Sequence, residues 1–201
     1  MKSIPPSEPL RPRSVGQTIR DHVVLLSAFL GAMWIVEILE LLPFVELDQF
    51  GIRPRTVGGL WGLLTSPFLH VDFRHLILNS LPFVVLGGTV LISGVRVFWA
   101  VTLFVMLAGG FGVWLLAPSF TNHIGASGLI FGYLGFLLAR GLFDRSLFTL
   151  LITVVILVGY GGLLWGVLPS DSGVSWQGHL FGFLAGAVAA WLASSIRNAK
   201  V

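Results

Sequence analysis

The sequence contains no cysteine. Disulfide bonds, a thiol nucleophile and thiolate metal sites are therefore excluded together. Charged residues are also scarce, since they make up 10% of the 201 residues, against about 25% in an average soluble domain. The net charge of +3 does not indicate a nucleic-acid partner, because most charged residues flank apolar runs, where they report membrane topology.

Apolar residues are abundant instead, at 55% of the chain, and the mean hydropathy is +0.91. Six apolar runs of about 17–23 residues follow one another, each long enough for a helix to cross about 30 Å of hydrocarbon. We place these spans at 22–44, 72–93, 96–117, 126–142, 147–168 and 177–195. The sequence therefore predicts an all-α polytopic membrane protein, a bundle of six transmembrane helices with the lipid bilayer as its solvent.

A bundle of this size leaves no room for a second domain. Residues 1–21 are polar and contain four prolines, so we expect a disordered cytoplasmic tail, without the layout of a cleaved signal peptide. Residues 22–196 form the predicted core, and 197–201 a short cytoplasmic C-terminal tail. The link at 45–71 is long and rich in turn formers. It contains Trp61, which we expect at the membrane interface.

Basic residues are distributed unequally between the two sides of the predicted membrane. With the N-terminus inside, the cytoplasmic set is Lys2, Arg11, Arg13, Arg20, Arg96, Arg140, Arg145, Arg197 and Lys200, and the outer set is Arg53, Arg55 and Arg74. This positive-inside bias predicts a multi-pass protein of the cell (inner) membrane with both termini in the cytoplasm. Spans two, four and six then begin on the outer side.

Four other polar residues lie within spans or at their edges. Glu37 and Glu40 are near the outer end of the first span, where we expect them to reach headgroups or a polar loop partner. His22 and His123 lie at span edges, and we interpret them as ordinary interfacial residues.

The fourth span opens with a short polar turn at residues 122–128, and Ser127 lies where the helix pattern begins. Free backbone N–H groups and the helix dipole favour negative charge at such a position. A hydroxyl there can attack a carbonyl and have the resulting oxyanion stabilised. The flanking Gly125 and Gly128 let another backbone come close. Taken alone, the pattern also fits a simple helix cap.

Polar residues also open the second and sixth spans, at a depth comparable to that of Ser127. His75 and Asn79 are four residues apart and share one helix face. His179 begins a stripe with Gly182 and Gly186 in the sixth span.

A similar small-residue stripe, Gly128, Gly132 and Gly135, follows Ser127 in the fourth span. Small stripes let membrane helices approach closely, although plain packing needs them too. We expect the fourth and sixth helices to meet and Ser127 to hydrogen-bond to His179.

These residues fit the parts of a serine hydrolase. Ser127 is the candidate nucleophile, and His179 the general base that later protonates the leaving amine. His75, Asn79 and the backbone N–H of Ser127 would form the oxyanion hole. No acidic residue is an evident partner of His179, so a dyad is expected. Phe131, one turn after Ser127, could pack on the imidazole, although an aromatic at helical spacing is also typical of a core.

Three motifs together resemble the rhomboid family of intramembrane serine proteases. They are Gly125-x-Ser127-Gly128, the spacing His70…His75…Asn79, and Gly178-His179-x-x-Gly182-x-x-x-Gly186. The resemblance covers all six spans. Many members have Trp-Arg in the first outer loop, where this chain has Trp61-Gly62.

The resemblance implies a Ser127–His179 dyad, oxyanion roles for His75 and Asn79, and a structural hydrogen-bonding role for His70. It implies no cofactor and no metal. It also implies substrates that are single-span membrane proteins, cut at small residues near the outer end of the helix. The fifth helix and the loop before His179 would act as the lateral gate, and the active site would open to the outer side.

Three alternatives remain open from the sequence. A catalytically inactive relative could bind client helices in the same groove, as a membrane chaperone does. A metalloprotein could use His70, His75 and His179, but His70 and His75 are five apart and no carboxylate clearly completes the set. A small transporter is a third possibility, although no inverted repeat is evident. The oligomeric state is not indicated.

Overall fold

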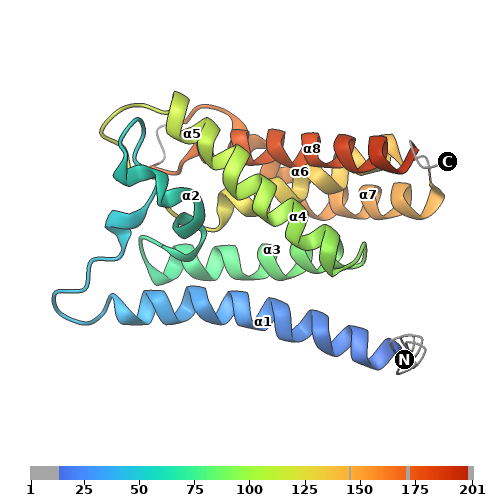
Figure 1. Ribbon diagram of the computed structural model, residues 1–201, viewed down its shortest axis with the longest axis horizontal. Helices are drawn as coiled ribbons and strands as arrows, with labels where there is room; N and C mark the ends of the chain where they lie inside the picture. The colour runs from blue at the N-terminus through green and yellow to red at the C-terminus, as the bar shows by residue number, and fades with distance from the viewer. Residues whose placement is uncertain (1–13, 145, 171–172, 199–201) are drawn as a thin grey trace, which may run out of the picture.

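The computed structural model describes residues 14–144, 146–170 and 173–198, and its helices form a bundle (Figure 1). The long elements are α1 (Val15–Leu39), α3 (Phe73–Leu91), α4 (Val95–Phe104), α5 (Gly110–Leu116), α6 (Ser127–Phe143), α7 (Leu147–Tyr160) and α8 (Trp176–Asn198). The short ones are η1 (Asp48–Phe50), η2 (Gly58–Leu60), α2 (Gly62–Thr65), η3 (Ser66–Phe68), the π-helical η4 (Val105–Gly109) and η5 (Gly161–Val167). Within the described residues, extended pairing is limited to one isolated β-bridge, between Ile52 and His123.

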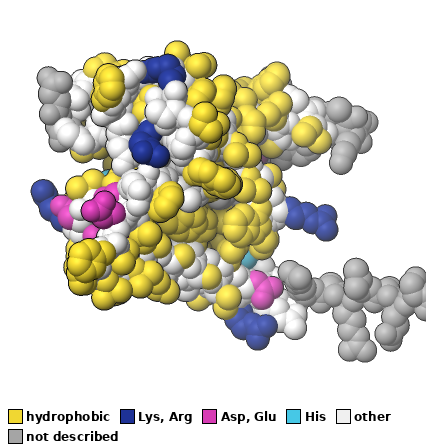
Figure 2. Space-filling model, turned by 60° about the vertical axis from the view of Figure 1, so that its left-hand side comes forward, with side chains coloured by type: hydrophobic (Ala, Val, Ile, Leu, Met, Phe, Trp, Pro, Cys, Tyr) yellow, Lys and Arg dark blue, Asp and Glu magenta, His cyan; other side chains and the backbone are white. Residues whose placement is uncertain are grey.

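Five stretches in the described part of the chain are helical, long and apolar enough to cross a membrane. They are Val15–Leu39, Phe73–Leu91, Val95–Leu116, Leu147–Val167 and Trp176–Ile196. The sixth apolar helix, Ser127–Phe143, is shorter. Hydrophobic side chains cover much of the face seen in Figure 2, as expected of a surface that contacts lipid. The molecule is an all-α, multi-pass membrane protein.

The first helix differs from its predicted bounds of 22–44. It begins at Val15 because Ser14 forms a capping box with Gln17: the Ser14 hydroxyl accepts from the Gln17 backbone, and the Gln17 side chain accepts from the Ser14 backbone. It ends at Leu39, shortly before Phe44 takes a positive φ of 72°. Residues 15–21, expected in a disordered tail, are therefore helical, and residues 1–13 lie outside the described residues.

At the other end of the chain, helix α8 continues to Asn198, two residues into the expected C-terminal tail. Residues 199–201 lie outside the described residues, as does Arg145, which was counted among the cytoplasmic basic residues.

Two glutamates at the C-terminal end of α1 have different surroundings. Glu40 accepts hydrogen bonds from the backbone N–H groups of Leu47 and Asp48, both at 2.8 Å. It therefore has the polar loop partner that the sequence suggested. Glu37 is 6% exposed, and its Oε2 has no hydrogen-bond partner among the described residues.

The long link after α1 folds into short helical turns and is anchored on α5. The Arg55 guanidinium donates to the Leu115 carbonyl at 2.8 Å and to the Ser119 hydroxyl at 2.6 Å. The indole of Trp114 donates to the Thr56 carbonyl at 2.9 Å. These contacts anchor the loop although the sequence has Trp61-Gly62 instead of Trp-Arg. Trp61 itself is 68% exposed.

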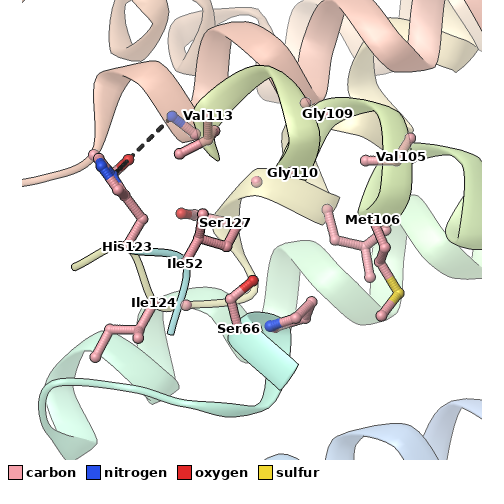
Figure 3. Close-up of a pocket in the computed structure, with 17 residues that line it drawn as sticks. Ile52, Ser66, Val105, Met106, Gly109, Gly110, Val113, His123, Ile124 and Ser127 are labelled. Carbon is pink, nitrogen blue, oxygen red and sulfur yellow. Dashed lines mark hydrogen bonds between the residues drawn. The ribbon is translucent and has the colours of Figure 1, made fainter. Parts of the chain in front are cut away.

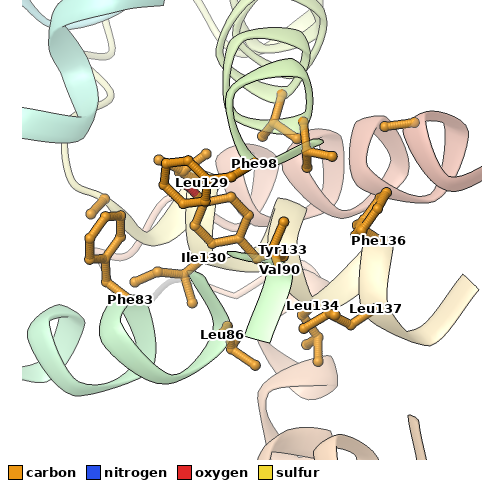
Figure 4. Packing of buried hydrophobic residues seen from close by; sticks show 14 of the residues in the cluster. Phe83, Leu86, Val90, Phe98, Leu129, Ile130, Tyr133, Leu134, Phe136 and Leu137 are labelled. Atoms are coloured by element: carbon orange, nitrogen blue, oxygen red, sulfur yellow. The ribbon is translucent and has the colours of Figure 1, made fainter. Parts of the chain in front are cut away.

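Helix α6 lies at the centre of the bundle and contacts α3, α4, α7 and α8. Most of its side chains are buried, and its aromatic and aliphatic residues join those of α3 and α4 in the main core (Figure 4). The Tyr133 hydroxyl is satisfied within this core by Thr102, at 2.8 Å. Burial on all sides explains why a helix of 17 residues is stable here: packing rather than length fixes it.

Glycines bring α6 and α8 into backbone contact, as the two small-residue stripes predicted. A Cβ built on Gly182 would overlap the carbonyl of Gly128, and one built on Gly186 would overlap the carbonyl of Gly132. Where α8 begins, a Cβ on Gly128 would lie 3.4 Å from the carbonyl oxygen of Gly178. The close approach of these backbones positions the first turns of the two helices side by side.

Candidate active site

Ser127 is the first residue of α6, and the turn before it is held by two backbone hydrogen bonds. Gly125 has a φ of +112°, which glycine adopts readily, and its N–H donates to the Ser66 carbonyl at 2.9 Å. The N–H of Ala126 donates to Nε2 of His70 at 3.3 Å. These contacts leave the Ser127 hydroxyl at a helix N-terminus, where backbone N–H groups lack intrahelical partners.

His179 lies in the first turn of α8 and faces Ser127. Its Nε2 is 2.9 Å from the Ser127 Oγ, and the residue is 6% exposed. The helices that carry the two side chains are the pair that the glycine stripes bring together. Residues 52 positions apart thus share one hydrogen bond.

The second ring nitrogen of His179 identifies the tautomer. Nδ1 is 2.9 Å from the carbonyl oxygen of Gly166, in η5. A carbonyl only accepts hydrogen bonds, so Nδ1 must carry the proton. In the neutral imidazole, Nε2 is then the unprotonated nitrogen and accepts from the Ser127 hydroxyl. A histidine in this state can take the hydroxyl proton.

Phe131 fixes the plane of the imidazole. Its ring is stacked on that of His179, with centroids 4.0 Å apart and an angle of 4° between the planes. Gly166 lies at the edge of both rings, since a Cβ there would be 2.9 Å from Cζ of Phe131 and 3.2 Å from Nδ1 of His179. A residue larger than glycine at position 166 would displace one of the two rings.

Two donors of the expected oxyanion hole come from α3. Asp72 caps this helix by accepting from the His75 N–H at 2.7 Å, which sets the first turn. The His75 ring lies against Gly125, since a Cβ on that glycine would be 2.6 Å from Cε1. Asn79, one turn later, is 6% exposed, and its Nδ2 has no hydrogen-bond partner among the described residues. An unpaired buried donor is costly in a resting protein and is a candidate for binding a ligand oxygen.

His70 supports the turn rather than facing the cleft. It is 1% exposed, and it packs edge-to-face on His75, with centroids 5.3 Å apart. Burial, and to a lesser degree the neighbouring His75, lowers the pKa of His70 to about 4. It is therefore neutral at physiological pH, and its Nε2 can accept from Ala126.

Two hollows meet at Ser127. A cleft of about 440 Å³ is lined by His75, Asn122, Ile124, Ser127 and Val174 among others. A smaller cavity of about 50 Å³ lies behind the serine, between η3, η4 and the start of α8 (Figure 3). The cleft has the size of a small ligand site, and the cavity has room for water. A candidate nucleophile, a candidate base, the candidate donor His75 and space for substrate and water are thus adjacent, the arrangement needed for acyl transfer.

Two sets of hydrogen bonds in the candidate site were not predicted from the sequence. The Gly166 carbonyl carries no sequence signal, because any residue supplies a backbone oxygen. The interpretation of His123 as an ordinary interfacial residue was wrong. His123 is 7% exposed, and both of its ring nitrogens are hydrogen-bonded, to Thr121 and Ser175. Its position four residues before Ser127 was the available signal.

Comparison with known proteins identifies the family to which the chain belongs. Residues 57–196 match the family model of the Rhomboid domain. An uncharacterized protein of Mycobacterium tuberculosis is 44% identical over 195 residues, covering 92% of this chain and 78% of that protein. Rhomboid protease GluP of Bacillus subtilis is 30% identical over 72% of this chain and 29% of its own length.

RHOMBOID-like protein 4 of Arabidopsis thaliana is also 30% identical, over 70% of this chain and 38% of its own length. The family match covers α2 to α8 and includes every residue of the candidate site from His70 to Gly182. The chain therefore belongs to the rhomboid family.

Proposed function

We propose that this protein is an intramembrane serine endopeptidase that cleaves membrane-protein substrates with a Ser127–His179 dyad. The observation that carries the proposal is the hydrogen bond of 2.9 Å between Ser127 Oγ and His179 Nε2, with the other ring nitrogen bound to the Gly166 carbonyl. A serine that only caps a helix requires neither a histidine partner nor a fixed tautomer.

In the proposed reaction, Nε2 of His179 takes the Ser127 proton as Oγ attacks the scissile carbonyl. The new oxyanion accepts hydrogen bonds from His75, Asn79 and the Ser127 N–H. His179 then gives the proton to the leaving amine, and an acyl-enzyme remains on Ser127. Water, deprotonated by the same nitrogen, releases the acyl group and restores the serine.

Substrate class and orientation are part of the proposal. The site lies among apolar helices, so the natural substrates are single-span membrane proteins cut near the outer end of the helix. Small residues there lower the cost of unwinding the helix to expose a peptide bond. The excess of Lys and Arg on one side supports an inner-membrane protein with both termini in the cytoplasm and a site that opens outward.

The non-catalytic alternative, a chaperone-like binder of client helices, is tested by the same experiment as the enzyme. The metalloprotein alternative finds little support in the site, because both ring nitrogens of His179 are already engaged. Among the residues that the structure describes, no group of three or more histidine or acidic side chains could hold a metal ion.

The test uses the full chain, purified and reconstituted into liposomes with model single-span substrates. Wild-type protein should cleave them and react with a fluorophosphonate, and Ser127→Ala and His179→Ala should do neither while keeping the wild-type melting temperature. A Ser80→Ala variant, whose hydroxyl bonds within α3 and to Trp34, serves as the control that retains activity. Cleavage by purified Ser127→Ala protein would overturn the proposal.

A further inference from the structure

The loop before α6 contains a buried histidine that the proposed chemistry does not use. His123 is 7% exposed and lies on the wall of the small cavity, with Ser127 opposite it (Figure 3). Its Nε2 is 2.8 Å from Thr121 Oγ1, and its Nδ1 is 2.6 Å from Ser175 Oγ. Ser175 belongs to the loop that leads into α8, so the second bond joins two loops that are remote in sequence.

The partners of these atoms fix the direction of each hydrogen bond. The Thr121 hydroxyl already donates to the Pro118 carbonyl at 2.7 Å, so it accepts from His123, and Nε2 carries the proton. Nδ1 is then the acceptor, and the Ser175 hydroxyl donates to it. Burial lowers the pKa of His123, which favours this neutral form.

Ser175 in turn directly precedes the first residue of α8. Its Oγ accepts from the N–H of Gly178 at 3.0 Å, and its carbonyl accepts from the N–H of His179 at 3.2 Å. The side chain therefore caps the helix that carries the base. A rotation of Ser175 would release the first turn of α8, in which His179 lies.

The backbone of His123 is also held in place, in the loop that leads to Ser127. Its backbone exchanges two hydrogen bonds of 3.0 Å with Ile52, in the long link after α1. It precedes Ser127 by four residues, and Ser175 precedes His179 by four. The His123–Ser175 bond thus joins the loop that enters α6 to the loop that enters α8, four residues ahead of each proposed catalytic residue.

We propose that His123 is a positioning residue that, through Ser175, holds the start of α8 against the start of α6 and so sets the distance between Ser127 and His179. The proposal rests on the proposed function, because its consequence is a rate. Glycine packing fixes how closely the two helices approach along their length, and the His123–Ser175 bond fixes the rotation and height of the first turn of α8.

Two substitutions test the hydrogen bonds of the two ring nitrogens of His123 separately. His123→Asn keeps a polar atom where Nδ1 lies and can still accept from Ser175, whereas His123→Gln keeps one where Nε2 lies and can still donate to Thr121. We expect kcat of His123→Gln to fall about threefold to tenfold, the worth of one hydrogen bond, with little change in KM. The His123→Asn variant, which keeps the acceptor for Ser175, should have a kcat close to that of the wild type.

A double-mutant cycle identifies the partner. Ser175→Ala alone should lower kcat at least as much as His123→Gln does. It removes both the hydrogen bond to His123 and the side-chain cap of α8. Combining His123→Gln with Ser175→Ala should cost little more than Ser175→Ala alone, since both remove the same bond. Melting temperatures of all variants separate this effect from general destabilisation.

Equal kcat values for the Asn and Gln variants, or additive effects in the cycle, would overturn the positioning role. So would a loss of rate that merely follows the loss of melting temperature. An inactive wild-type protein that no fluorophosphonate labels would contradict the proposed function itself, and the positioning role with it. The two failures are therefore distinguishable, because only the second abolishes wild-type turnover.

Discussion

The ring of Phe131 lies parallel to the imidazole of His179, with centroids 4.0 Å apart, and the carbonyl of Gly166 holds that imidazole by its edge. The imidazole is therefore oriented by a side chain of α6 and by the backbone of η5. The proposed dyad needs no carboxylate, because a carbonyl oxygen is sufficient to select the tautomer with an unprotonated Nε2.

Gly166→Ala tests this orientation. The added Cβ would contact the Phe131 ring and Nδ1 of His179, so the imidazole or the ring stacked on it must shift and the geometry of the Ser127–His179 pair must change. We expect kcat to fall about 10–100-fold, because misplacing a reacting group by about 1 Å can cost that much. The matched control is Gly162→Ala in the same helical segment, where a Cβ meets nothing within 4 Å. Equal rates for the two variants would refute the orienting role of this position.

Asn79→Ala tests the oxyanion hole. If the unpaired Nδ2 of Asn79 binds the developing oxyanion, its loss should lower kcat by up to about 10²–10³-fold and leave KM nearly unchanged. Kinetics in liposomes measure this split. Ile77→Ala, at a side chain that is 56% exposed on the same helix, is the control. If Asn79→Ala matched wild type, Asn79 would be a packing residue instead.

Gly186→Ala tests the contact between α6 and α8. A Cβ at this position overlaps the Gly132 carbonyl, so the helices must separate. We expect the variant to lose about 1–3 kcal/mol of stability, the usual cost of overpacking. Thermal unfolding in detergent measures the loss. Gly31→Ala in α1 is the control, since a Cβ there meets nothing within 4 Å. Unchanged melting of Gly186→Ala would show that this approach is not tight.

Asp48 provides a pH dependence with a defined sign. Burial, and secondarily the nearby Glu40, raises the pKa of Asp48 from 3.8 to about 6. The folded state therefore holds this proton more tightly than the unfolded state does. The contribution of Asp48 to stability is complete below about pH 4 and is lost as the pH rises through 6.

Asp48→Asn should accordingly melt at a higher temperature than wild type at pH 7.5, and at a similar temperature near pH 4, where the wild-type carboxyl is protonated. Glu46→Gln, at a neighbouring exposed position, is the control for a general loss of negative charge. A stabilisation of Asp48→Asn that is the same at both pH values would contradict the raised pKa.

Hydropathy and spacing were sufficient to predict most of the fold. The second to sixth apolar runs match the helices within about three residues, because in a bilayer every backbone group must be bonded within its own helix. The first apolar run differs from α1 in its bounds. A hydropathy pattern does not reveal the capping box at Ser14, which starts α1 among polar residues. The glycine spacing likewise predicted the contact of α6 with α8, since helical periodicity assigns residues to faces.

The sequence alone determined which residue types are present for the proposed chemistry and on which helix each one lies, because local periodicity and polarity suffice for that. Only the tertiary structure decided the tautomer of His179 and the network of His123. The first depends on a backbone carbonyl 13 residues away, and the second on a serine 52 residues away. Such contacts depend on where loops lie after the helices have packed, and neither hydropathy nor spacing encodes that position.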